Sequence, residues 1–131
     1  MKRGNQYYSL EYNKDKNRIY FTMTGDIPSV EVVANFEKDW HLTVEEARKG
    51  FTILGDLSLC GVLNPEFEAL NQKVQAWLMA NGCGKVAQLI GNLDVMSQVN
   101  AFAERSGMRE VLRAFNFATN AEKWLDWNPK R

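Results

Sequence analysis

The chain has 131 residues, of which 45% are hydrophobic and 11% aromatic, and its 16 basic side chains balance 16 acidic ones. This length fits one domain, residues 1–131, with a core of its own, and the composition is that of a folded protein. The balanced charge excludes a global field that favours nucleic acid or an anionic membrane. No apolar run approaches the roughly 20 residues that span a bilayer, and the polar start does not resemble a signal peptide, so we expect a cytoplasmic protein.

The first elements predict a β-hairpin followed by a helix. Residues 7–12 and 18–24 are rich in aromatic and β-branched side chains, which is typical of strands. The polar linker 13–17 between them predicts a turn of about five residues. Ser29 is then expected to cap a helix whose apolar residues recur at helical spacing, and Gly50 is expected to end it.

A buried strand and a second helix follow. Residues 51–57 predict a strand that ends abruptly in a polar edge containing Asp56 and Ser58. At Asn64-Pro65 asparagine can cap a helix and proline suits its first position. Asn81-Gly82 ends this helix. Its predicted buried stripe consists of Phe67, Leu70, Val74, Trp77 and Leu78.

The remaining chain continues to alternate strands with helices. We predict a short strand over 86–90, a helix that starts near Asp94 or Ser97, a strand over 110–115, and a capping box over 119–122 that opens a last helix. This ββαβαβαβα order requires right-handed parallel crossovers. The sequence therefore predicts an α/β fold with a single sheet of about five strands, parallel except for an antiparallel strand at the N-terminal edge.

Polar side chains gather where the predicted parallel strands end, which is where open α/β sheets bind ligands and partners. The competing interpretation is that aspartate, asparagine and serine are ordinary turn and capping residues at these positions. The candidate binding residues are Asp26, Asp56, Ser58, Asn64, Asn92 and Asp94.

The sequence contains no recognisable catalytic or metal-binding constellation. Cys60 and Cys83 are expected at opposite ends of neighbouring strands, too far apart for a disulfide, and neither has a nearby histidine to lower its thiol pKa. His41, the only histidine, is expected on a solvated helix face. We therefore expect no cofactor and no metal, and an enzyme that uses Asp56 with a cofactor is the least favoured hypothesis.

Trp124 and Trp127 lie close together near the end of the sequence. An exposed tryptophan there can anchor a dimer or another partner, since aromatic side chains dominate interface energetics. Packing of the last helix explains the pair equally well. Both interpretations stay open.

The order of the predicted elements and several short motifs resemble a known protein family. The hairpin leading into Thr24-Gly25-Asp26-Ile27 resembles the opening of STAS domains, the fold shared by anti-sigma-factor antagonists and the cytoplasmic tails of sulfate transporters. The strand 53–58, with its Asp-Leu-Ser ending, is similar to the central strand of that family. Residues 113–115 and 121–125 are similar to a bacterial STAS-like group. The resemblance implies helices wound against a sheet whose strands run in sequential order.

The loop after the central strand departs from the family pattern. Anti-sigma-factor antagonists carry an Asp-Ser-Ser-Gly-like run there, in which one serine is phosphorylated to switch partner binding. This chain has Gly61-Val62-Leu63-Asn64 instead, and no serine or threonine between Cys60 and Asn71. The roughly −2 charge of a phosphate cannot be added without a hydroxyl.

The resemblance and its departure together predict a non-catalytic regulatory or protein-interaction module that lacks the phosphorylatable serine. It would bind a protein partner through the segment 56–64 and the helix that starts at Pro65. A small-molecule carrier for an apolar or nucleotide-like ligand is the alternative, and a homodimer remains open. We expect no nucleic-acid partner.

Overall fold

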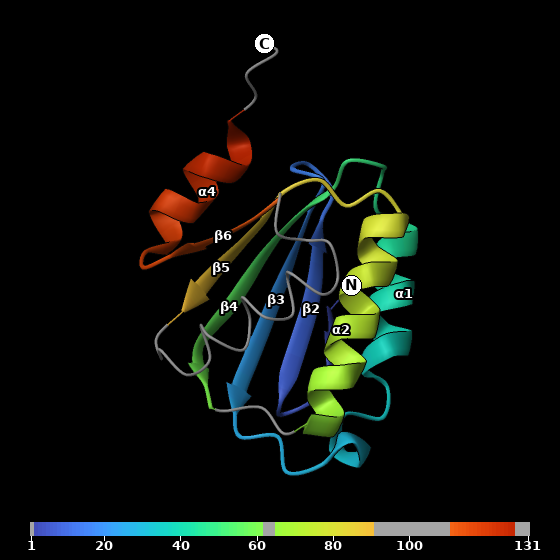
Figure 1. Ribbon diagram of the computed structural model, residues 1–131. Helices are drawn as coiled ribbons and strands as arrows, with labels where there is room; N and C mark the ends of the chain where they lie inside the picture. The colour runs from blue at the N-terminus through green and yellow to red at the C-terminus, as the bar shows by residue number, and fades with distance from the viewer. Residues whose placement is uncertain (1, 62–64, 91–110, 128–131) are drawn as a thin grey trace.

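The computed structural model describes residues 2–61, 65–90 and 111–127, which form a mixed six-stranded sheet with helices on both faces (Figure 1). The strands lie side by side in sequence order. β1 pairs antiparallel with β2 and β2 with β3, whereas all later pairs are parallel. The strands are β1 (Lys2–Gly4), β2 (Tyr8–Asn13), β3 (Arg18–Gly25), β4 (Thr52–Cys60), β5 (Val86–Ile90) and β6 (Leu112–Phe115).

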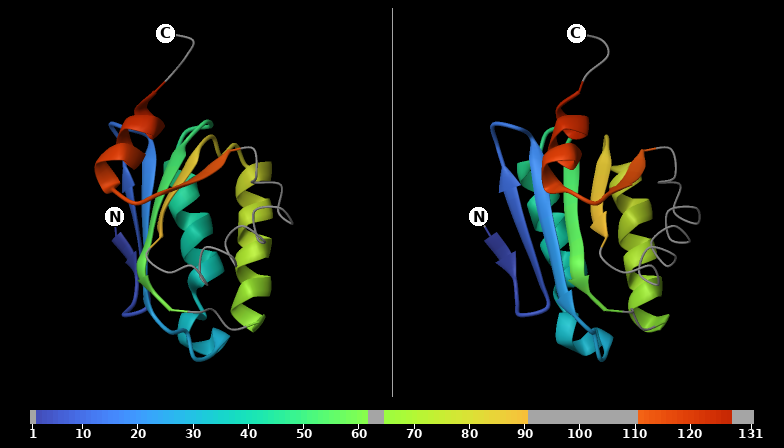
Figure 2. Two further views of the ribbon diagram at one scale, coloured as in Figure 1. Left: turned by 60° about the vertical axis from the view of Figure 1, so that its left-hand side comes forward. Right: turned by 90° about the vertical axis from the view of Figure 1, so that its left-hand side faces the viewer.

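The helices form two separate layers. Helices α1 and α2 cover one face of the sheet and α4 lies on the opposite face (Figures 1 and 2). No helix in the described ranges is long and apolar enough to cross a membrane. The helical segments are the 3₁₀ helix η1 (Val30–Val33), α1 (Phe36–Glu46), α2 (Pro65–Ala80) and α4 (Ala118–Asp126).

The predicted α/β fold with one mixed sheet is confirmed, but the sheet has six strands rather than about five. The additional strand, β1, pairs along β2 and carries Lys2 and Arg3. The Arg3 guanidinium donates to Glu46 of α1 at 2.6 Å and to the Thr43 hydroxyl at 3.3 Å. The three residues of β1 are polar or small and show no alternating pattern, so periodicity does not predict this strand.

The single helix predicted between Ser29 and Gly50 is wrong. The chain forms η1 first, and α1 begins only after Asn35, whose carbonyl accepts the Asp39 N–H at 2.8 Å. Ser29 makes no side-chain capping hydrogen bond. Three β-branched valines fall within η1, and such side chains fit an α-helix poorly because they restrict χ1. Gly50 has a positive φ of 88°, but it lies beyond the end of α1, in the turn before β4.

An aromatic cluster joins the sheet to α1 and α2. Phe36 is fully buried, and its ring lies 5.1 Å from Phe67 of α2 and 5.2 Å from Tyr8 of β2. Phe21 of β3 lies 5.2 Å from Trp40 of α1. Each such pair contributes about 0.5–1.5 kcal/mol beyond its buried area. Phe36 therefore fixes three elements at once.

Helix α2 begins at Pro65 and ends near Gly82, as predicted. Gly82 has a positive φ of 94°, and the Cys83 N–H returns to the Leu78 carbonyl at 3.1 Å, which closes the helix in a Schellman-like turn. The predicted cap Asn64 lies outside the described residues, as does the helix predicted after Asp94 or Ser97. The predicted stripe of α2 is buried or half-buried: Phe67, Leu70, Val74, Trp77 and Leu78.

Helix α4 is attached to the sheet by a buried ion-pair cluster. Arg18, the first residue of β3, is only 2% exposed. Its guanidinium donates to Thr52 at 2.9 Å, to Asp126 at 2.8 Å and to Glu122. The Tyr20 hydroxyl donates to Glu122 at 2.9 Å. The hydrogen bonds satisfy a charge that burial alone would strongly destabilise.

Lys85 holds the other end of α4. Its ammonium group donates to the Trp124 and Trp127 carbonyls, both at 2.6 Å, and therefore offsets the negative end of the helix dipole. The capping box predicted over 119–122 is wrong. The helix begins at Ala118 with Phe117 at the N-cap position, so Thr119 lies inside the helix and does not cap it. The Glu122 carboxylate binds Arg18 and Tyr20 instead.

This cluster predicts an acid-sensitive contribution to stability. Burial alone would raise the pKa of Glu122, but hydrogen bonds from Tyr20 and Arg18 and the charge of Arg18 outweigh burial and lower the pKa. A carboxyl with a lowered pKa stabilises the fold above its unfolded pKa of about 4.3, and the stabilisation is lost as the pH falls through the folded pKa. We therefore expect Glu122→Gln to lower the urea midpoint clearly at pH 7 and much less at about pH 3.

Urea titration followed by circular dichroism measures both values. Glu11→Gln, on an exposed position of β2, is the matched control and is expected to leave both midpoints nearly unchanged. An equal loss for Glu122→Gln at the two pH values would contradict the assigned role of the Glu122 charge.

Candidate functional site

The predicted binding edge begins where β3 and β4 end together. Gly25 is the Cα partner of Cys60, and the Gly61 N–H donates to the Gly25 carbonyl at 3.0 Å. The exposed Asp26 carboxylate lies directly against Gly61, since a Cβ added to Gly61 would come 1.7 Å from Asp26 Oδ1. A glycine at 61 is therefore required for the position of Asp26.

The prediction that the strand ends at the polar edge containing Asp56 and Ser58 is wrong. β4 continues to Cys60, and a β-bulge inserts one residue, because Thr22 pairs with Asp56 but Thr24 pairs with Leu59. Asp56 Oδ1 accepts the Ser58 N–H at 3.0 Å and the Ser58 hydroxyl at 2.6 Å. The bulge leaves Leu59 71% exposed.

The structure brings together only part of the predicted set. Asp56 and Ser58 contact each other, whereas Asp26 lies at Gly61, five residues further along the chain. Five residues of extended chain cover roughly 16 Å, so Asp56 and Asp26 do not share one small-ligand site. The remaining candidates lie outside the described residues: Asn64, Asn92 and Asp94.

A groove opens between η1 and the first turns of α2. The start of α2 lies at the same end of the fold as the carboxyl ends of β3 and β4 (Figure 1). The volume of the groove is about 590 Å³. Two exposed carboxylates, Glu31 and Glu66, belong to its rim. Its apolar lining consists of Val30, Val33, Ala34, Ala69 and Leu70.

Sequence reasoning missed this groove. It predicted one continuous helix after Ser29 and assigned Leu70 to the buried stripe of the next helix, whereas Val30 lies in η1 and both Val30 and Leu70 are half-buried. The signal that points to the groove is the run of valines before Asn35, which disfavours a continuous helix and favours a separate turn of 3₁₀ helix. The pairing of that turn with α2 is a tertiary contact that spacing along the chain does not show.

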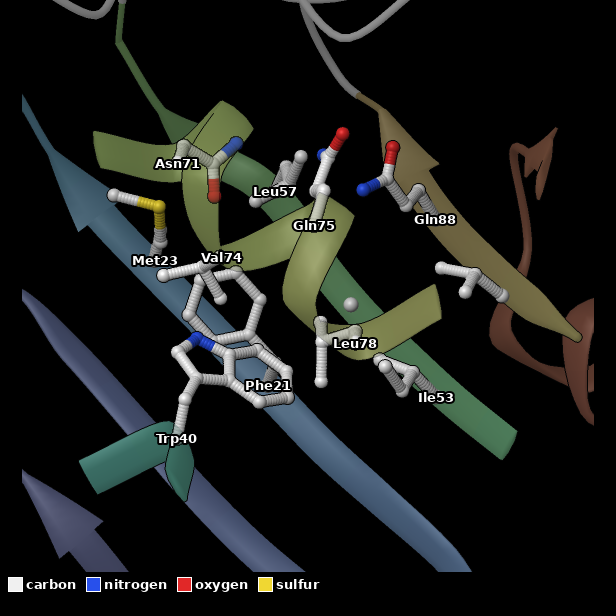
Figure 3. Close-up of a pocket in the computed structure, with 12 residues that line it drawn as sticks. Phe21, Met23, Trp40, Ile53, Leu57, Asn71, Val74, Gln75, Leu78 and Gln88 are labelled. Atoms are coloured by element: carbon white, nitrogen blue, oxygen red, sulfur yellow. The ribbon is translucent and has the colours of Figure 1, made fainter. Parts of the chain in front are cut away.

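A second hollow lies between α2 and the sheet, with Gln75 and Gln88 towards one end and Trp40 towards the other (Figure 3). Its volume is about 30 Å³. A cavity of about 150 Å³ admits benzene, and one water needs about 10–15 Å³, so this cavity suits water rather than an organic ligand. Trp40 Nε1 and Gln88 Oε1 have no hydrogen-bond partner among the described residues and are the polar atoms that water would satisfy.

A polar hollow of about 550 Å³ lies at the opposite end of the strands, beside Lys16, Arg18 and Lys85. Its cations already have partners. Arg18 binds Glu122 and Asp126, and Lys85 donates to two carbonyls of α4. These contacts make the hollow the docking region of α4 rather than a free anion site.

The thiols and the histidine are structural. Burial and the charge of Asp26 raise the pKa of Cys60 to about 11, and burial raises the pKa of Cys83 to about 12. Both cysteines are free, as predicted. The solvated position predicted for His41 is wrong, because its ring stacks on Trp77 at 3.9 Å. Within the described ranges, no three His, Cys, Asp or Glu side chains are grouped to hold a metal ion.

The comparisons with known proteins add no assignment: no family model matches the chain, and no curated protein matches its sequence. The functional inference therefore depends on the groove, the strand ends and the chemical state of the polar groups.

The thiol environment predicts slow alkylation. At pH 7.5 the thiolate fraction of a thiol whose pKa is about 11 is more than about 100-fold smaller than the thiolate fraction of an unfolded cysteine. Because the thiolate is the reactive form, Cys60 is expected to react with iodoacetamide at least about 100-fold more slowly in the folded chain. A mass-spectrometric time course on native protein measures the rate, with the chain unfolded in guanidinium as the control. Native alkylation as fast as in the unfolded chain would indicate an activated thiolate and contradict a structural role.

Proposed function

We propose that this chain is a non-catalytic, regulatory protein-interaction module of STAS type that binds a protein partner in the groove between η1 and α2. The observation that carries the proposal is the groove itself, an apolar surface with an acidic rim. It lies beside the start of α2, the segment that the family resemblance marks as the partner-binding region. The sequential order of the strands supports the same resemblance.

The shape of the groove favours a polypeptide segment over a small molecule. Small-ligand sites enclose most of the surface of their ligand. This groove instead lies open between two helical segments, and both segments contribute apolar residues to its lining, as in grooves that receive side chains from one face of a peptide. The enclosed cavity under α2 is too small for the apolar or nucleotide-like ligand of the alternative hypothesis.

The acidic rim indicates the chemistry of the partner. Glu66 lies in the first turn of α2, where a carboxylate also stabilises the helix dipole, but Glu31 lies on a four-residue 3₁₀ helix, where that effect is small. Opposite charges across an interface speed association and select the partner. We expect the bound segment to present apolar side chains flanked by lysine or arginine.

Four groups with possible chemical reactivity in the described part of the chain serve structural purposes: Asp56, Cys60, Cys83 and His41. Asp56 Oδ1 is held by Ser58, the raised pKa of each thiol keeps it protonated at neutral pH, and the His41 ring is stacked. These contacts support a binding role. Because residues 61–70 contain no hydroxyl side chain, the proposed binding is not switched by phosphorylation in that segment.

Two identical substitutions on α2 test the groove. Ala69 and Ala76 are both exposed and lie seven residues apart on one helix, but only Ala69 lines the groove. Ala69→Glu places bulk and negative charge in the apolar lining, so we expect at least about ten-fold weaker capture of a partner from extracts of the source cells. Ala76→Glu is expected to capture it as the native chain does, and both variants are expected to keep the native melting temperature.

Affinity purification with quantitative mass spectrometry compares the three proteins. Equal recovery by the two variants would place the binding surface elsewhere. A native chain that recovers no partner above the level of an unrelated control protein would contradict the proposed function itself.

A further inference from the structure

The two edges of the sheet differ in how they are protected. Natural proteins guard an edge strand by making it short, charged or irregular. β1 is only three residues long, carries Lys2 and Arg3, and ends at Gly4 with a φ of 132°. β6, at the other edge, is also short, with four residues, and it carries one charged side chain, Arg113. It contains neither lysine nor proline, and no strand in the described part of the chain pairs along its outer side. The right-hand view of Figure 2 looks onto the face of the sheet that carries α4, with β6 at the right-hand side of the sheet and α2 behind it.

The hydrogen bonds to β5 show which backbone groups of β6 remain free. The Val86 N–H donates to the Val111 carbonyl at 2.9 Å, and Val86 is the Cα partner of Leu112. In a parallel pair this pattern directs the N–H and C=O groups of every second residue towards the neighbouring strand. Val111, Arg113 and Phe115 therefore bond towards β5, and Leu112 and Ala114 direct their backbone groups outward.

The described side chains of β6 do not block that outward edge. The Arg113 guanidinium lies 5.0 Å from the centre of the Trp124 ring, and the Phe115 ring lies 5.6 Å from it, so both side chains turn towards α4. Ala114 is exposed and carries only a methyl group. Phe117 follows in extended conformation and is 68% exposed. A backbone edge with an adjacent exposed aromatic ring is suited to strand pairing.

We propose that β6 pairs antiparallel with β6 of a second copy of this chain, across a two-fold axis at Ala114, so that two sheets become one continuous sheet. Directly opposed residues in an antiparallel pair must both direct their backbone groups to the partner or both away from it. A two-fold axis that passes through a residue meets this condition. To pair three residues of the four-residue β6, the axis must pass through Arg113 or Ala114.

Charge selects between these two registers. An axis at Arg113 sets two arginines directly opposite each other, which is destabilising. An axis at Ala114 sets Arg113 opposite the partner subunit's Phe115, a cation and an aromatic ring that attract. It also sets the exposed Phe117 opposite the partner subunit's Val111. Because the paired edge is short, we expect a dimer with micromolar affinity.

This proposal is independent of the groove, which lies between η1 and α2 rather than at β6. Sedimentation velocity of the full chain over roughly 5–300 μM is expected to show a reversible monomer–dimer equilibrium. Ala114→Pro removes only an outward N–H, and Ala114→Lys adds the charge that guards natural edges, so both are expected to remain monomeric with a native urea midpoint. Ala80→Lys, an identical change at an exposed position at the end of α2, is expected to dimerise as the native chain does.

A cysteine pair tests the register. With the axis at Ala114, air oxidation of Ala114→Cys is expected to give a disulfide-linked dimer, because directly opposed Cα atoms lie about 5.5 Å apart. Asn116→Cys is expected to stay unlinked, since the two copies of that residue lie roughly 14 Å apart in this register. A native chain that stays monomeric throughout, an Ala114→Lys dimer of native affinity, or equal cross-linking at both positions would overturn the proposal. Pairing of β6 only with a different protein would overturn it too.

Discussion

The buried guanidinium of Arg18 is the contact on which the second layer of this fold depends. Removing such a charge from water costs several kcal/mol, and the cost is offset only when hydrogen-bonded partners of opposite charge surround it. Those partners, Glu122 and Asp126, come from a helix 104 and 108 residues further along the chain. The first residue of β3 therefore fixes the position of the last described helix, and Lys85 fixes its carboxyl end.

The position of α4 determines which surfaces stay uncovered. Ala121 and Leu125 of α4 cover Leu54 and Ala87, in the middle of the sheet, while α1 and α2 cover the opposite face around Phe36. Among the residues that the structure describes, this arrangement leaves the outer edge of β6 and the groove beside η1 uncovered. Both are surfaces suited to polypeptide partners, one through backbone pairing and the other through an apolar lining with acidic residues.

Much of the fold follows from local pattern, and the exceptions have physical causes. The hairpin, β5 and α2 show clear periodicity, whereas β1 has only three residues and no apolar pattern. The predicted capping box is wrong because α4 begins at Ala118, before Thr119, and Glu122 binds Arg18, a contact that local pattern does not show. The predicted end of β4 at Asp56 and Ser58 is too early, because the strand continues through a β-bulge to Cys60. The groove joins η1 to α2, a tertiary contact that sequence spacing does not reveal.

The central claim is that the groove between η1 and α2 binds a protein partner. Its most direct test is site-specific photocross-linking in the source cells, with benzoylphenylalanine at position 69 in the groove and at position 76 on the same helix outside it. We expect one dominant adduct with a different protein from position 69, mapped to an apolar segment flanked by basic residues, and none from position 76. The same adducts from both positions, or no adduct from position 69, would contradict it.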